Sequence, residues 1–421
     1  MQKLINKCKK HKRGLLIILI VVVSIFKIFC IFNTSHKSDL FGFHYNWCKY
    51  ISSNSIFSIY SPNQDIPPVF SINYPPIFLF LLWPISGFAV SVFDIGNVAL
   101  YLILVKSPII LLNILFTIYL YKKVNKYFAI FWYCNPLLIF DTEIWGQTDS
   151  LLCAVIILFI LSITKHSYIK SSIFFAIGCL LKLQMCYLFP VFLILILKSK
   201  NLKNIILSLF AGGTVGVLGW LPFVLYNRDV FLPVRIYLNG PQSQTSLNYN
   251  SCNFFSLFGS VEISDINILG LNGSTLNMIL LCTIITISCI LLYKAQTAEL
   301  EILYTAFYLF SIYMFTFSQH ERYLIPTAIL FTLLAFLYNK KYTIFFIATS
   351  ISSIICMVIA FITDYLYWNR QPFIPSILSS TMFSLAFIIT LLIYSYMIYV
   401  IFTTTKRIKD TRGEVVTKNI D

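Results

Sequence analysis

Charged residues are scarce in this sequence of 421 residues. They make up 11% of the chain, against about 25% in soluble domains. Hydrophobic residues reach 58%, aromatic residues reach 17%, and the mean hydropathy is +0.81. This composition excludes an ordinary soluble domain, and the long apolar runs predict an all-α polytopic membrane protein.

Acidic residues are fewer than basic residues in this sequence. The chain has 16 Asp and Glu against 31 Lys and Arg, which gives a formal net charge of +15. In a soluble protein this excess would suggest a nucleic-acid surface. Here the basic residues fall in short clusters between apolar runs, which is typical of topology signals in membrane proteins. We therefore expect contact with membrane lipid and no nucleic-acid partner.

Several motifs are also missing. The sequence has 11 cysteines but no CxxC or zinc spacing, and it has no glycine-rich phosphate loop, Walker sequence or GxSxG elbow. These absences argue against zinc, ATP-driven and hydrolase chemistry. No soluble domain, tandem repeat or low-complexity tract is evident, so we predict one integral domain over 1–421. Cys48 and Cys252 fall in predicted outer loops, and a disulfide between them is left open.

The topology follows from apolar runs and basic clusters. The basic segment 1–13 precedes an apolar run, Gly14 to Phe32, that exceeds the roughly 7 to 15 residues of a signal-peptide core, so we interpret it as a retained anchor. With about 20 apolar residues per span, we predict about twelve spanning helices and cytoplasmic termini. The predicted spans are 14–32, 98–121, 127–141, 149–164, 171–182, 184–198, 204–226, 270–293, 300–317, 322–338, 343–362 and 376–402.

The remaining segments are assigned by the same rules. Two long outer loops, 33–97 and 227–269, are expected to fold into short helices, and 403–421 forms a cytoplasmic tail. The apolar run 75–93 would invert every later basic loop if it crossed the membrane, so we keep it outside as a re-entrant or interfacial segment. The segment 171–198 is either two short helices or one bent hairpin.

In this predicted topology, the polar residues outside the basic clusters gather near the outer face of the membrane. Lys182 stands in an apolar stretch, where an ammonium group is costly unless it finds a partner. His320 to Arg322 form a charged triplet between two apolar runs, although a loop salt bridge would also explain them. Asp149 also fits a helix cap, and Asp39 also fits a solvated loop.

Glycosyl transfer from a lipid-phosphate sugar uses these residue types together. The acceptor hydroxyl needs a carboxylate base, and the departing lipid phosphate needs cations. Aromatic rings such as Trp47 and Tyr74 stack on sugars, although an interfacial aromatic belt predicts the same residues. The site residues therefore indicate an enzyme that acts at the outer face of the membrane it spans.

The motifs, in order, resemble a known family. They are "SDLFGFHYNW", "INYPPIFLFLL", "NPLLIFDTEIWGQTDSLL", "LLKLQMCYLFPVFL", "TSLNYNSCNFFSLFG" and "FSQHERYLIPT". The set is similar to bacterial membrane mannosyltransferases related to the enzyme that adds the second mannose of GPI anchors, within the GT-C superfamily. The resemblance implies a GT-C-like fold, a polyprenyl-phosphate sugar donor, and a glycan or glycolipid acceptor.

The resemblance also implies roles for individual residues. Asp39 becomes the catalytic base, and Asp149 a second acid or acceptor-binding group. The donor phosphate is held by Lys182, His320 and Arg322. The remaining sugar- or acceptor-binding candidates are Trp47, Tyr74, Gln147, Gln184, Asn250 and Glu321. No metal site or cofactor is required, although a divalent cation stays possible, and Lys-Leu-Gln at 182–184 replaces the Lys-Pro-Gln expected in many relatives.

The expected function is therefore an inverting hexosyl transfer, with mannose the first choice, on the outer face of a bacterial inner membrane. A lipid-linked-sugar or polysaccharide transporter is the alternative from another class, but such a protein is expected to carry internal repeats with sites near the midplane. An outer-face polysaccharide polymerase is a further alternative. It would differ from the expected transferase in needing a lipid-diphosphate oligosaccharide donor.

Overall fold

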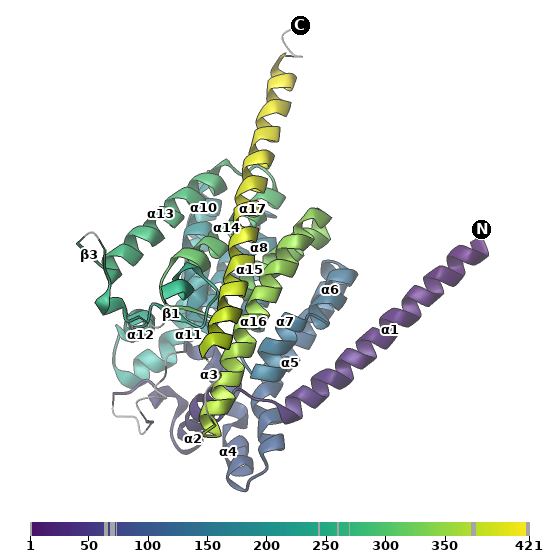
Figure 1. The fold of residues 1–421 in the computed structure, drawn as a ribbon. Helices are drawn as coiled ribbons and strands as arrows, with labels where there is room; N and C mark the ends of the chain where they lie inside the picture. Colours follow the sequence, from purple (N-terminus) through teal and green to yellow (C-terminus); the bar gives the residue numbers. More distant parts are fainter. Residues whose placement is uncertain are drawn as a thin grey trace.

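The protein is an all-α membrane protein, as predicted. The computed structural model describes residues 2–62, 66–67, 72, 74–242, 245–258, 261–268, 270–371 and 376–417. Figure 1 shows long helices gathered into one bundle, with short helices at its lower end. The α-helices are α1 (Gln2–Asn33), α2 (Tyr45–Ser53), α3 (Pro76–Leu82), α4 (Ser86–Asp94), α5 (Val98–Lys123), α6 (Lys126–Tyr133), α7 (Pro136–Ile139), α8 (Asp149–Ile163), α9 (Tyr168–Leu181), α10 (Phe189–Leu197), α11 (Leu202–Asn227), α12 (Leu232–Gln242), α13 (Gly273–Lys294), α14 (Ala298–Phe315), α15 (Ile325–Leu337), α16 (Thr343–Trp368) and α17 (Ser376–Thr417).

Shorter elements connect these helices. Two of them, η1 (Ser38–His44) and η5 (Phe140–Trp145), are π-helical. The 3₁₀ segments are η2 (Ile56–Ser58), η4 (Trp83–Ile85), η6 (Leu183–Leu188), η7 (Phe254–Phe258), η8 (Ile263–Asp265) and η9 (Lys340–Tyr342). The strands are β1 (Asn248–Tyr249), β2 (Asn267–Ile268), β3 (Leu271–Asn272) and β4 (Gln319–His320). Strand β1 pairs with β4 in parallel, and β2 pairs with β3 antiparallel.

Asparagine side chains begin many of the helices. Asn97, Asn125, Asn201 and Asn272 each accept a hydrogen bond from a backbone N–H in the first turn that follows. Such caps satisfy donors that the helix itself leaves open, which matters most where little water is present. The polar residues between the apolar runs therefore fix where α5, α6, α11 and α13 start.

The described residues contain eight helices or helical segments that are long and apolar enough to cross a membrane, plus shorter apolar helices at Asp149–Ile163, Tyr168–Leu181, Leu183–Leu197 and Ile325–Leu337. The predicted span at 127–141 is broken into α6, α7 and η5, because Pro136 starts a new helix after Asn135. The predicted total of twelve spans stays a prediction.

Two uncertain segments take definite shapes. Pro76–Asp94 is apolar enough to cross a membrane, but it consists of three short pieces, α3, η4 and α4, and Figure 1 places α4 at the lower end beside α2. The segment 171–198 forms two helices, α9 and α10, because Lys182 is extended (φ −155°, ψ 138°) and interrupts the helix.

The core lies where α8, α10, α14 and α15 pack together. The outer helices α1, α11 and α13 expose apolar side chains instead, which suits contact with lipid. In Figure 1, α1 leans away from the bundle and meets it near α5 and η5. Helix α1 therefore contacts the bundle mainly through its carboxyl-terminal end.

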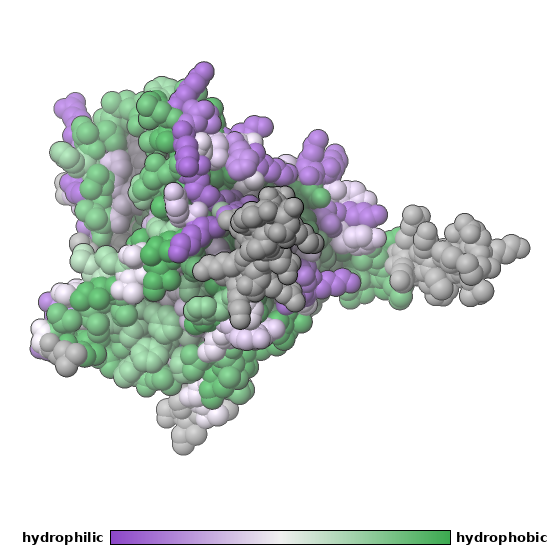
Figure 2. Space-filling view, turned by 90° about the horizontal axis from the view of Figure 1, so that it is seen from above, coloured by the Kyte–Doolittle hydropathy of each residue, from purple (hydrophilic) through white to green (hydrophobic). Residues whose placement is uncertain are grey.

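The loops with lysine clusters meet at one end of the bundle. Lys198 pairs with Glu301 at the start of α14, and the Tyr342 hydroxyl donates to Glu299 on the same helix. The amino end of α1 and the carboxyl end of α17 lie on this upper side in Figure 1. Figure 2, seen from above, shows hydrophilic residues gathered across that side. This arrangement fits the predicted topology, although the side of the membrane stays a prediction.

Candidate active site

Two π-helical segments meet at the candidate site. Segment η1 follows α1 and carries Asp39, and η5 precedes α8 and carries Trp145. Gly146 ends η5 with φ +95°, and a Cβ there would meet Leu40 at 2.8 Å, so this turn requires glycine. The turn brings Gln147 back toward Asp39. Single π-turns are frequent at functional sites because they re-aim side chains.

Asp39 is bound on one oxygen. Its Oδ2 atom accepts hydrogen bonds of 2.6 Å from Trp145 Nε1 and from Gln147 Nε2. His36 Nδ1 lies 3.5 Å from the same oxygen, and the His36 ring stacks on Trp145 with centroids 4.3 Å apart. All hydrogen bonds that Asp39 accepts from the described residues go to Oδ2. Its Oδ1 atom is therefore available to a hydroxyl from a substrate.

The surroundings of Asp39 favour its ionised form. Burial acts to raise its pKa, but the charges of His36 and Arg322 and the hydrogen bonds from Trp145 and Gln147 outweigh burial, so the pKa lies below the usual range of a carboxyl group. An ionised carboxylate is the form that a general base requires. The structure therefore keeps Asp39 as a carboxylate at neutral pH.

We expect the pH dependence of transfer to reflect this lowered pKa. Because Asp39 stays ionised from neutral pH down to its ordinary pKa of about 3.9, kcat/KM should be flat over that range and fall only at lower pH. The measurement is kcat/KM against pH in detergent or liposomes, with a refolding control at each pH. An acid limb between about pH 6 and 7 would contradict Asp39 as the base.

A second carboxylate sits between two cations. Asp149 begins α8, and its Oδ2 atom lies 2.7 Å from Lys182 Nζ and 3.3 Å from Arg322 Nε. Arg322 also pairs with Glu321, at 2.5 Å between Nη1 and Oε1. The Asp149 and Lys182 side chains are 1% and 7% exposed. The cost of burying these charges is met by their pairing.

Two atoms of this cluster are left open. The Asp149 Oδ1 atom and the Arg322 Nε atom are buried without a hydrogen-bond partner among the described residues, although Nε lies near Asp149 Oδ2. An unsatisfied buried donor and an unsatisfied buried acceptor are each costly. A ligand with a hydroxyl group and a phosphate oxygen would satisfy both.

One aromatic ring joins the two carboxylate clusters. The Arg322 guanidinium lies over Trp145, 5.5 Å from the ring centroid, and Trp145 donates to Asp39. Tyr74 makes a second link, since its hydroxyl donates to Gln147 Oε1 at 2.9 Å and its ring lies 5.8 Å from Lys182 Nζ. The structure therefore brings Asp39, Asp149, Lys182 and Arg322 close together, while their roles stay predictions.

The charged triplet borders this site through a strand pair. His320 belongs to β4, which pairs with β1, and Asn250 forms a bridge to His320. The His320 ring stacks on Tyr249, with centroids 4.8 Å apart, and Nδ1 lies 3.8 Å from Glu321 Oε2. Burial acts to raise the pKa of Glu321, but Arg322 and His320 lower it to about 2. Glu321 thus stays ionised beside Arg322.

The other predicted sugar-binding residues lie in two settings. Gln184 lines a small cavity of about 30 Å³ with Gln319 and Tyr323, next to the charged cluster. Trp47 is 1% exposed and packs against Tyr74 and Phe78, so its ring is covered in this structure. The roles of all these residues stay predictions.

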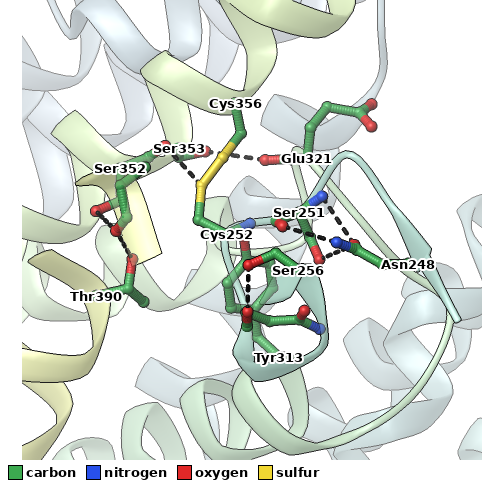
Figure 3. Close-up of a disulfide and its surroundings, with 12 residues drawn as sticks. Asn248, Ser251, Cys252, Ser256, Tyr313, Glu321, Ser352, Ser353, Cys356 and Thr390 are labelled. Carbon is green, nitrogen blue, oxygen red and sulfur yellow. Dashed lines mark hydrogen bonds between the residues drawn. A yellow bond between two sulfur atoms is a disulfide. The ribbon is translucent and has the colours of Figure 1, made fainter. Parts of the chain in front are cut away.

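A disulfide bounds the site on the side of α16 (Figure 3). Cys252, just after β1, is bonded to Cys356, whereas Cys48 is free and buried. The Cys48–Cys252 pairing that was left open is therefore wrong. Helix α16, and not the segment that carries Cys48, packs against the segment that contains Cys252. Ser353, on the same helix, donates to the Glu321 carbonyl at 3.4 Å. The disulfide and this bond join the charged triplet to α16.

Sequence reasoning missed residues that position Asp39. Asp364 of α16 accepts hydrogen bonds from the backbone N–H groups of Lys37 and Ser38, at 2.6 and 3.2 Å. Lys106 of α5 is fully buried and donates to the Thr34 and Glu143 carbonyls, at 2.6 and 2.7 Å. For Lys106 the available signal was an ionisable residue within the predicted span 98–121, whereas Asp364 lies just beyond the predicted span 343–362.

Metal ligands are not grouped in the described part of the chain. Within it, no cluster of three or more His, Cys, Asp or Glu side chains has a geometry that would hold a metal ion. Whether a divalent cation takes part stays a prediction.

The fold is that of an integral membrane protein in which buried carboxylates and cations meet beside the first loop after α1. The family model for glycosyltransferase family 87 matches residues 72–318, and the chain belongs to that family. The protein is therefore a membrane glycosyltransferase. The match includes Asp149 and Lys182, begins after Asp39 and ends before Arg322. The chain matches no curated protein.

Proposed function

We propose that the enzyme moves a hexose, most simply mannose, from a polyprenyl-phosphate sugar to a hydroxyl of a lipid-linked or envelope glycan. The observation that carries this proposal is the single cluster in which Asp39, with Oδ1 available, faces Arg322 across Trp145. A base and an anion-binding cation on either side of an aromatic ring suit a sugar whose acceptor and phosphate lie at opposite faces.

The reaction is a single displacement. The acceptor oxygen forms a bond to the anomeric carbon while its proton passes to Asp39 Oδ1. The bond between the anomeric carbon and the phosphate oxygen breaks, and polyprenyl phosphate leaves with the bonding electrons. Lys182 and the Arg322 Nε atom stabilise that phosphate, and Asp149 Oδ1 accepts a hydrogen bond from a sugar hydroxyl. The anomeric configuration is inverted.

The outer face of a bacterial inner membrane is the proposed location of the site. The Cys252–Cys356 disulfide supports this side, because disulfides persist in oxidising compartments and are rare in the cytosol. The lysine-rich loops at the opposite end of the bundle support the same orientation.

A donor panel tests the proposal. Purified protein in liposomes is incubated with membrane lipid extract and radiolabelled polyprenyl-phosphate mannose, polyprenyl-phosphate glucose or the matching nucleotide sugars. We expect label to reach a glycan or glycolipid from a polyprenyl-phosphate donor, with release of polyprenyl phosphate, and not from nucleotide sugars. Transfer from a nucleotide sugar alone, or from none of the donors, would refute the proposed donor class.

A further inference from the structure

Two cysteine sulfurs face each other across the turn that carries Lys182. Cys179 lies in the last turn of α9 and Cys186 lies in η6, and their Sγ atoms are 3.8 Å apart. We propose that Cys179 and Cys186 are oxidised to a second disulfide that closes the turn around Lys182 and Gln184. The pairing itself does not depend on the identity of the sugar donor.

The local backbone permits this bond. A disulfide needs an S–S distance of about 2.05 Å, so the two sulfurs must approach by less than about 2 Å, which is within the reach of side-chain rotation. Cys186 is exposed and belongs to a short 3₁₀ segment, and Lys182 between the two cysteines is extended. Cys179 is fixed by the last turn of α9, whereas Cys186 lies beyond the break at Lys182 and outside any α-helix.

The surroundings favour oxidation. The cavity beside Gln184 and Tyr187 is also lined by Gln319, and Gln319 pairs with Asn248 in the short strand pair that precedes Cys252. The segment that carries Cys186 is therefore connected, through Gln319 and Asn248, to the strand pair beside the Cys252–Cys356 disulfide. A compartment that maintains one disulfide there also oxidises an exposed thiol, here Cys186, that has a second thiol beside it.

The redox step balances by thiol–disulfide exchange. The two thiols lose two protons and two electrons and form one S–S bond, and an external disulfide, such as that of a protein oxidant or of glutathione, is reduced to two thiols. The closed turn holds Lys182, which lies 2.7 Å from Asp149, and Gln184. Oxidation would thus restrict the segment that carries a predicted phosphate-binding side chain.

Differential alkylation of the full-length protein tests the pairing. The protein is incubated with oxidised glutathione and then denatured in the presence of N-ethylmaleimide, which alkylates the free thiols. After reduction, iodoacetamide alkylates the cysteines that had been oxidised, and mass spectrometry identifies the label on each cysteine. We expect Cys179 and Cys186 to carry the iodoacetamide label, and the free, exposed Cys282 to carry N-ethylmaleimide. A peptide pair linked by Cys179 and Cys186 should be found before reduction.

A matched variant separates pairing from reaction with glutathione. In Cys186→Ser, Cys179 should lose its partner and carry N-ethylmaleimide, whereas Cys153→Ser should leave the Cys179 label unchanged. The proposal is overturned if Cys179 and Cys186 carry N-ethylmaleimide after oxidation, or if Cys179 remains protected in Cys186→Ser. Neither readout requires transfer activity, so failure here leaves the proposed function untouched, and the reverse also holds.

Discussion

Asp39→Asn is expected to lower kcat for glycosyl transfer by about 10²–10⁴-fold, the usual contribution of a general base. The amide keeps the size of the side chain and can still accept hydrogen bonds from Trp145 and Gln147, but it cannot take a proton from the acceptor. Because the donor phosphate is proposed to lie on Lys182 and Arg322, KM for the donor should change little. The measurement is the initial rate of transfer at several donor concentrations.

Asp94→Asn is the matched control for this variant. Asp94 is also an acidic residue of the predicted outer loop 33–97, but it is exposed and accepts a hydrogen bond from Tyr45 at the surface. Its replacement should leave kcat within about twofold of the wild type, as for most surface changes. Equal rates for Asp39→Asn and the wild-type protein would remove Asp39 from the mechanism.

Lys182→Met is expected to destabilise the protein by about 3–5 kcal/mol, because it leaves Asp149 buried with one cation fewer. Adding Asp149→Asn should restore most of that stability, since the remaining charge imbalance is removed. Transfer should remain low in the double variant, because the proposed phosphate contact is still missing. Thermal unfolding in detergent measures stability, and transfer is assayed below the melting temperature of each variant.

This pair of variants separates two roles of Lys182. If Lys182 only neutralises Asp149, the double variant should regain stability and transfer as fast as the single variant Asp149→Asn, and the proposed phosphate contact would be wrong. Lys49→Met serves as the control, because Lys49 is an exposed cation of the predicted outer loop 33–97. It should change neither stability nor transfer beyond the small effects typical of surface sites.

Much of the fold could be predicted because the bilayer imposes it. Apolar length alone located α1, α5, α11, α13 and α16, since a spanning helix needs about 20 such residues. The cost of isolated charge in an apolar stretch likewise marked Lys182 and Arg322 as residues that need a partner. Asp149 is that partner for both.

Details that depend on tertiary packing could not be predicted. The π-helical segments η1 and η5 lie where α1 packs against η5, and no local sequence pattern distinguishes them from ordinary helix. Cys252 pairs with Cys356 because α16 packs beside the segment that contains Cys252. The two cysteines are 104 residues apart in the sequence. Asp364 and His36 join the site for the same reason, through long-range contacts that single-sequence periodicity does not carry.

The anomeric configuration of the product tests the central claim most directly. A polyprenyl-phosphate hexose of one defined anomer is incubated with the purified enzyme and an acceptor, and the new linkage is assigned by NMR. A single displacement assisted by Asp39 predicts a product of the opposite anomeric configuration. A product that retains the configuration of the donor would require a covalent sugar intermediate and would contradict this account.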